Sequence, residues 1–128
     1  MTLRQDLKDV LDGVVPVHEE DDGGLTIQHD GTFASLRVVT LAEGLDLISL
    51  SQIVAWDVPL DSRIRGKIAA LARDTMLGTV VLVEKKRMGE VLLRYNFPGL
   101  GLSDDALRTF VLLVLSTGAQ VRRSLAAA

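Results

Sequence analysis

Cysteine is absent from this 128-residue chain, and aromatic residues make up only 4% of it. The first absence excludes disulfide bonds and thiol nucleophiles. The scarcity of aromatic residues predicts a core of leucine, valine and isoleucine. Its few large side chains would be Phe33, Trp56, Tyr95, Phe97 and Phe110. The only two histidines, His18 and His29, are expected to be ordinary surface residues.

Long apolar runs are also missing. The longest, from Phe110 to Leu115, has six residues, whereas a membrane span needs about 20. The first ten residues alternate charged residues with leucine, which is unlike a signal peptide. The net charge of −3 is a mild imbalance that argues against a nucleic-acid partner. We therefore expect a soluble, cytoplasmic protein with no membrane or nucleic-acid partner, folded as a single domain over residues 1–128.

Apolar residues at helical spacing predict three helices, over residues 2–14, from Asp61 or Ser62 to residue 77, and from Ser103 to residue 125. Thr2 with Gln5, Asp61 or Ser62, and Ser103 are suitable N-terminal caps. The last helix is apolar nearly all round at its middle, so it must be covered on more than one side. Its predicted core line comprises Leu107, Phe110, Val111, Val114, Gly118, Val121 and Leu125, and its off-line leucines are Leu112, Leu113 and Leu115.

Five further runs predict strands, over residues 25–29, 33–41, 45–55, 79–84 and 90–97. Turn signals such as Asp30-Gly31 separate them. Strands joined by tight turns pair antiparallel. The predicted fold class is therefore α+β, in the order α-β-β-β-α-β-β-α, with a five-stranded antiparallel sheet and three helices.

Few residues suggest chemistry. The loop from His18 to Gly24 holds four carboxylates and one histidine, which are metal-ligand types, but a solvated acidic turn is the preferred interpretation and no metal or cofactor is predicted. The basic turn from Lys85 to Gly89 is likewise expected to be solvated. No nucleophile or acid–base pair is evident, so we expect no enzyme. A cleft that gathered His29 and Asp30 with an arginine such as Arg37 or Arg94 would change that expectation.

Three segments resemble a known family. They are the strand–turn–strand LTIQHDGTFASLRVV, the helix entry VPLDSRIRGKIAALAR and the strand-to-helix passage LLRYNFPGLGLSDDALRTFV. Together they are similar to the YbjN-like domain proteins of bacteria and, more distantly, to the type III secretion chaperones that share their fold. The similarity extends over nearly the whole chain from Leu25 onward. It consists of apolar and turn residues rather than a catalytic motif.

The resemblance implies a homodimeric, chaperone-like or adaptor module that shields an apolar segment of an unknown client protein. In the secretion chaperones the middle helix lies at the dimer interface, which makes Ile64, Ile68 and Leu71 dimer candidates here. Client-binding candidates are Leu3, Leu7, Val10 and Leu11 of the first helix, unless they are core, and Leu112 and Leu113 of the last. The alternative is a small-ligand sensor or regulatory domain, with a closed apolar pocket of about 300 Å³ or more lined by residues such as Trp56 and Tyr95.

Overall fold

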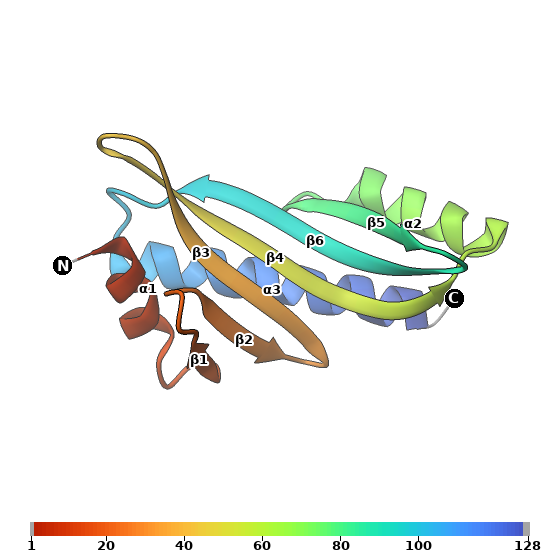
Figure 1. The fold of residues 1–128 in the computed structure, drawn as a ribbon, viewed down its shortest axis with the longest axis horizontal. Helices are drawn as coiled ribbons and strands as arrows, with labels where there is room; N and C mark the ends of the chain where they lie inside the picture. The colour runs from red at the N-terminus through yellow and green to blue at the C-terminus, as the bar shows by residue number, and fades with distance from the viewer. Residues whose placement is uncertain (1, 127–128) are drawn as a thin grey trace.

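The computed structural model describes residues 2–126, which form three helices and a single six-stranded sheet (Figure 1). The helices are α1 (Leu3–Leu11), α2 (Ser62–Asp74) and α3 (Asp104–Ala126). The strands are β1 (Val17–Glu19), β2 (Leu25–His29), β3 (Thr32–Ala42), β4 (Leu45–Pro59), β5 (Thr79–Lys85) and β6 (Met88–Pro98).

Every pairing in the sheet is antiparallel, and the strand order is β1-β2-β3-β4-β6-β5. The first four strands form a meander. The chain then passes through α2 to the far edge, and β6 returns between β4 and β5. The predicted α+β class and element order are confirmed, but the sheet has six strands rather than five. The additional strand, β1, lies partly in the predicted acidic loop, and three residues, two of them polar, are too short a run to show a strand period.

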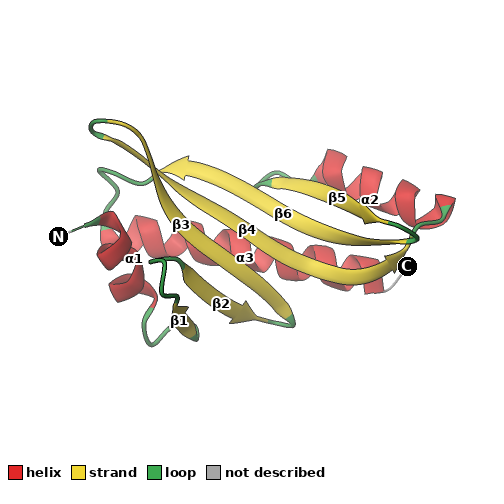
Figure 2. Cartoon of the chain, viewed as in Figure 1, coloured by secondary structure: helices red, strands yellow, loops and turns green. Residues whose placement is uncertain are grey.

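All three helices lie on one face of the sheet, as Figure 2 shows, and the other face carries no helix of the described chain. Helix α3 contacts β3, β4 and β6, and both α1 and α2 contact α3. The side chains that point toward the helices alternate with those that do not. On β4 the helix-facing Ile48, Leu50 and Val54 are fully buried, whereas Ser49, Ser51 and Ile53 between them are only half-buried.

One polar side chain lies inside this apolar core. Gln52 of β4 is fully buried, and its Nε2 donates to Thr32 Oγ1 at 2.8 Å and to the Leu115 carbonyl of α3 at 3.1 Å. Its Oε1 has no hydrogen-bond partner in the part of the chain that the structure describes. A Cβ atom at Gly118 would lie 2.0 Å from that oxygen. Glycine at this position therefore lets the amide approach α3 closely.

The predicted caps are confirmed. The side-chain oxygens of Thr2, Asp61 and Ser103 accept the backbone N–H groups of residues 5, 64 and 106. Some element ends differ from the prediction. Helix α1 ends at Leu11 because Asp12 has a ψ of 131°, and β4 continues to Pro59 rather than ending at residue 55.

The core line predicted for α3 is largely correct. Leu107, Val111, Val114, Gly118, Val121 and Leu125 are all buried, and Phe110 is half-buried and packs against the core. The prediction for Leu115 is wrong, because the helical pattern puts Leu115 off this line whereas the side chain is fully buried. The sheet lies against one side of α3, and α1 and α2 lie against others, so the buried sector is wider than a single line.

Candidate interaction surface

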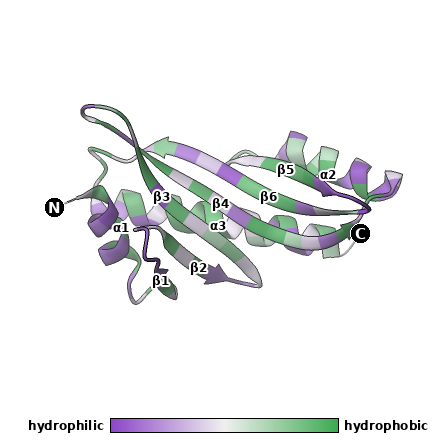
Figure 3. Ribbon diagram, viewed as in Figure 1, coloured by the Kyte–Doolittle hydropathy of each residue, from purple (hydrophilic) through white to green (hydrophobic). Residues whose placement is uncertain are grey.

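A row of apolar side chains crosses four strands on the face that the helices leave open. Its members are register partners: Phe33 of β3 pairs with Ile53 of β4, Ile53 pairs with Leu92 of β6, and Leu92 pairs with Val81 of β5. Phe33 is exposed, and the other three are half-buried by one another and by the sheet. Bands of hydrophobic colour recur along these strands in Figure 3. We call Phe33, Ile53, Leu92 and Val81 the apolar row.

A polar row lies immediately beside the apolar row, two residues along each strand. From β1 to β5 its register partners are His18, Thr26, Ser35, Ser51, Arg94 and Thr79. Arg94 is exposed, and no carboxylate of the described chain lies within ion-pair distance of it. On the opposite side of the apolar row, Glu90 is neutralised by Lys85, with Nζ and Oε1 2.6 Å apart. Arg94 is thus the uncompensated charge next to the apolar row.

An exposed aromatic pair extends the apolar row at the end of the β2–β3 hairpin. The rings of Phe33 and Trp56 meet edge to face with centroids 5.8 Å apart, and they are 42% and 38% exposed. The β4–β6 register shifts between Ala55 and Val58, and within that interval Asp57 has a φ of 49°. Such bulges re-aim side chains. Arg122 of α3 lies 5.6 Å from the Trp56 ring centroid and supports it from the helix side.

The two edges of the sheet differ in how they are protected. At one edge, β1 has three residues, follows Pro16 and contains Glu19. At the other, β5 pairs with β6 through seven residues without a register shift, and four consecutive apolar residues, Val80 to Val83, form its middle. Short strands, proline and charge discourage edge pairing, whereas a long, regular, apolar edge is a template for another strand.

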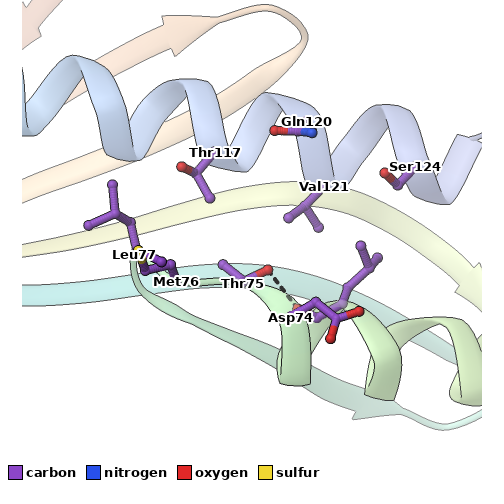
Figure 4. A pocket seen from close by; sticks show the side chains of 9 residues that line it. Asp74, Thr75, Met76, Leu77, Thr117, Gln120, Val121 and Ser124 are labelled. Atoms are coloured by element: carbon purple, nitrogen blue, oxygen red, sulfur yellow. Dashed lines mark hydrogen bonds between the residues drawn. The ribbon is translucent and has the colours of Figure 1, made fainter.

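A groove of about 320 Å³ lies between the end of α2 and α3 (Figure 4). Leu71 and Met76 line it from the α2 side, and Thr117, Gln120 and Val121 line it from α3. The ligand-sensor hypothesis predicted a closed, mostly apolar pocket lined by Trp56 and Tyr95. This groove is open, includes polar side chains, and is lined by neither of those residues. Trp56 lines a separate open hollow of about 220 Å³ beside Ile64 and Arg122, which is smaller than the predicted pocket and does not include Tyr95. Tyr95 instead stacks on Phe97, which stacks on Phe110 of α3 on the helix side of the sheet.

Most of the residues predicted to meet other proteins lie inside this chain. Leu3, Leu7, Val10 and Leu11 of α1 are buried in the core. Ile64 and Ile68 of α2 are also buried, and Leu71 is half-buried beside the groove. Their apolar faces are satisfied by neighbouring elements of the same chain. A partner could reach them only if α1 or α2 moved, so these positions do not form a surface in this structure.

The two candidates on α3 differ from each other. Leu112 is half-buried and packs against the core, whereas Leu113 is 49% exposed. Leu113 lines a shallow hollow together with Phe110 and Thr109. The hollow lies on α3, so Leu113 is separate from the apolar row on the open face of the sheet.

The residues considered for catalysis are not gathered in one cleft. His29 Nε2 lies 3.7 Å from Asp30 Oδ2, but Arg37 turns to Asp22, with Nη2 and Oδ2 2.7 Å apart. Arg94 is opposite Ser51, in the middle of the sheet. Among residues 2–126, no group of three or more histidine, cysteine, aspartate or glutamate side chains is placed to hold a metal ion.

Ion pairs and hydrogen bonds hold the acidic loop against the rest of the chain. Arg4 of α1 pairs with Glu19, and Thr26 Oγ1 donates to Glu20 Oε1 at 2.9 Å. Asp22 accepts from Arg37 and from the backbone N–H of Gly24, and these hydrogen bonds, that from Arg37 above all, hold the pKa of Asp22 below its ordinary value. These contacts give the carboxylates a structural role.

Sequence reasoning did not find the apolar row. The alternation within each strand indicates two faces, but Ile53 and Leu92 are far apart in the chain and become neighbours only through the β4–β6 pairing. That pairing depends on the passage through α2. The available signal was Trp56 next to charged Asp57, together with apolar residues of β5 and β6 in excess of what one buried face requires.

The helices of the described residues include none that is long and apolar enough to span a membrane. No family model matches the chain, and a search of curated proteins finds no match. Among solved structures, the chain is similar to the crystal structure of YbjN from E. coli, a proposed transcription regulator. The TM-score is 0.68 at 14% sequence identity, and the alignment covers 96% of this chain and 90% of YbjN. The predicted resemblance is thereby confirmed at the level of the fold.

Proposed function

We propose, starting from this YbjN-like fold, that the chain is a non-enzymatic protein-binding module of the chaperone or adaptor kind. Its open sheet face would receive an apolar segment of a partner protein. The observation that carries the proposal is the apolar row, extended by Trp56, on a face that no helix of the described chain covers. A fold alone does not specify function, whereas an exposed apolar surface of this kind supports a binding role.

The composition of the surface supports a protein partner. Residues that dominate protein interfaces are aromatic residues and arginine, flanked by contacts that exclude water. The open face places Phe33 and Arg94 around Ile53 and Leu92, and Trp56 borders that face at the rim of the sheet, where it contacts both Phe33 and Arg122 of α3. The chain has only five aromatic residues, so exposing two of them together leaves fewer large side chains to fill the core. A binding role accounts for that placement.

The test is affinity capture from a lysate of the source organism with two matched variants. In the first, Ile53→Thr with Leu92→Thr removes the apolar row but retains residues that favour strands. The control is Val39→Thr with Leu47→Thr, another register pair on the same face, located toward the β3–β4 turn. We expect one dominant protein to be captured by the wild type and the control and lost from the first variant. Equal capture by all three would reject the proposal.

We extend the proposal to a homodimer formed through the edge strand β5. The predicted dimer residues Ile64 and Ile68 are occupied within the chain, whereas β5 offers a regular, apolar, unpaired edge in the described structure. Two copies of β5 can pair antiparallel about Val81, which would continue the apolar row into the second chain. The pairing would place Val80 opposite Leu82 on the helix side.

The oligomeric state tests this extension. Val83→Lys places a charge on the edge strand, and Val39→Lys places one on the same face away from that edge. By size-exclusion chromatography with light scattering, the wild type and Val39→Lys should be dimers and Val83→Lys a monomer. A monomeric wild type would reject the homodimer and leave the binding face untouched.

A further inference from the structure

The structure assigns a class of partner to the apolar row: an amphipathic helix that lies across the strands and carries a carboxylate on the flank that faces Arg94. This inference rests on the proposed function and adds the shape and charge of the bound segment.

The length of the row suits two to three turns of helix. Adjacent strands are about 4.8 Å apart, so the four strands from β3 to β5 span about 14 Å between the outer side chains. A helix rises about 1.5 Å per residue, and apolar residues at positions i, i+3 or i+4, and i+7 extend over about 10.5 Å. Three such side chains can therefore contact the apolar row from Phe33 to Val81, with one end of the helix against Trp56.

The backbone of the segment favours a helix over an extended chain. A strand laid on the face of a sheet finds no backbone partners there, because the N–H and C=O groups of β3, β4 and β6 already pair within the sheet. Burying its own polar groups against Ile53 and Leu92 would be costly. A helix satisfies its backbone internally and presents only side chains. The opposite face shows that this sheet can pack against a helix, because α3 contacts β3, β4 and β6 there, although α3 runs along the strands rather than across them (Figure 1).

The charges beside the apolar row determine which flank of the bound helix carries the acidic residue. Arg94 lies two residues from Leu92 on the same face, about 7 Å away along the strand, which is the distance from the apolar stripe of a helix to its flank. Arg94 is exposed and has no carboxylate partner among residues 2–126. Its register partners Ser51 and Thr79 add hydroxyl groups beside it. Glu90, on the other flank, is already paired with Lys85. An acidic residue of the partner would therefore form its strongest ion pair with Arg94.

Two other occupants fit less well. A second copy laid face to face would bury the polar row together with the exposed Arg94. A single-stranded nucleic acid could stack bases on Phe33 and Trp56, but such a site also needs a track of cations. On this face Arg37 is already bound to Asp22, and the chain carries a net charge of −3. Both occupants are outcomes that the test distinguishes.

The test is selection of a displayed random library of peptides of about 18 residues, long enough to form a helix, on the wild-type protein. We expect the enriched sequences to carry apolar residues with a 3.6-residue period and an acidic residue on one flank. Synthetic winners should bind with a change in fluorescence of Trp56, the only tryptophan. Arg94→Gln should weaken them about tenfold, and Arg63→Gln, on the exposed side of α2, should not. A winner with its acid changed to glutamine should bind wild type and Arg94→Gln equally.

Several results would overturn the helix. These are winners with a two-residue period, winners without an acidic flank, no enrichment, competition by a poly-dT oligonucleotide, or face-to-face self-association of the protein that Ile53→Thr with Leu92→Thr abolishes. The lysate experiment distinguishes a failure of the helix inference from a failure of the proposed binding function. Capture that depends on Ile53 and Leu92, without helical winners, would remove the helix and keep the binding face. Capture that is indifferent to the apolar row would remove both.

Discussion

On β4, Leu50 points toward the helices and Ile53 points away from them, three residues further along the same strand. Leu50 is fully buried among leucine, valine and isoleucine side chains, whereas Ile53 is half-buried in a row that ends at exposed Phe33. The aromatic residues divide in a similar way, because Tyr95, Phe97 and Phe110 are stacked on the helix side and are buried or half-buried, whereas Phe33 and Trp56 are exposed. The helix face accounts for stability, and the open face supplies a surface beyond what stability requires.

The largest effect should come from truncation on the helix face. Leu50→Ala removes a fully buried side chain and leaves a cavity, which should lower the free energy of unfolding by about 2–5 kcal/mol. Urea denaturation followed by circular dichroism measures the change. A loss below about 1 kcal/mol would mean that the core near Leu50 can collapse and that the two faces differ less than their burial indicates.

The contact between Gln52 and Gly118 should produce the next largest effect. Alanine normally stabilises a helix relative to glycine by about 1 kcal/mol. At Gly118 the added Cβ would meet the buried Gln52 amide at 2.0 Å, so Gly118→Ala should instead cost about 1–3 kcal/mol. In a Gln52→Ala background the same change should be neutral or favourable. Equal costs in both backgrounds, by urea denaturation, would show that this contact does not determine the approach of α3.

The open face should tolerate change far better. Ile53→Thr with Leu92→Thr keeps β-branched or strand-compatible side chains on half-buried positions, and the pair should cost less than about 1.5 kcal/mol. Urea denaturation again measures it, beside Leu50→Ala. If this double variant unfolds as readily as Leu50→Ala, the apolar row is part of the core and the contrast between the faces disappears.

The smallest effect concerns pH. The pKa of Asp22 is lowered in the folded chain by its hydrogen bonds with Arg37 and the Gly24 N–H. A carboxylate whose pKa is lower in the folded state than in the unfolded state stabilises the fold at every pH above the unfolded-state pKa. For Asp22 that unfolded-state pKa is about 3.8, and the stabilisation is lost as the pH falls below it. Asp22→Asn should therefore slightly flatten the acid side of the Tm–pH profile. Asp21→Asn, in the same loop, should leave the profile unchanged. Identical profiles for Asp22→Asn and wild type would show that Asp22 does not contribute to stability in this way.

The local features were predictable from the sequence because they depend on neighbouring residues. Ser103 is followed by two aspartates and then an apolar helix, and it caps α3 as expected. Asp30 and Gly31 form the β2–β3 turn, both with positive φ. The apolar stripe of α1 was equally visible, but periodicity could not decide between a core and a client. In the structure α1 packs on α3 and β3, so its apolar stripe belongs to the core.

The candidate interaction surface could not be predicted because it depends on the register of the strands. Val81, Leu92, Ile53 and Phe33 form a row only through three separate strand pairings, one of which joins segments on opposite sides of α2. Each residue alone looks like an ordinary strand residue. The charge of Arg94 has meaning only once Leu92 and Ser51 are known to be its neighbours.

The most direct test of the account is methyl NMR of the isoleucine, leucine and valine side chains while the captured partner is added. The open-face methyl groups of Ile53, Leu92 and Val81 should shift or broaden, and those of helix-facing Leu36 and Leu50 should remain nearly unchanged. This pattern would establish the open face as the binding surface. Changes confined to α1 or to the groove between α2 and α3, with the apolar row silent, would contradict the central claim.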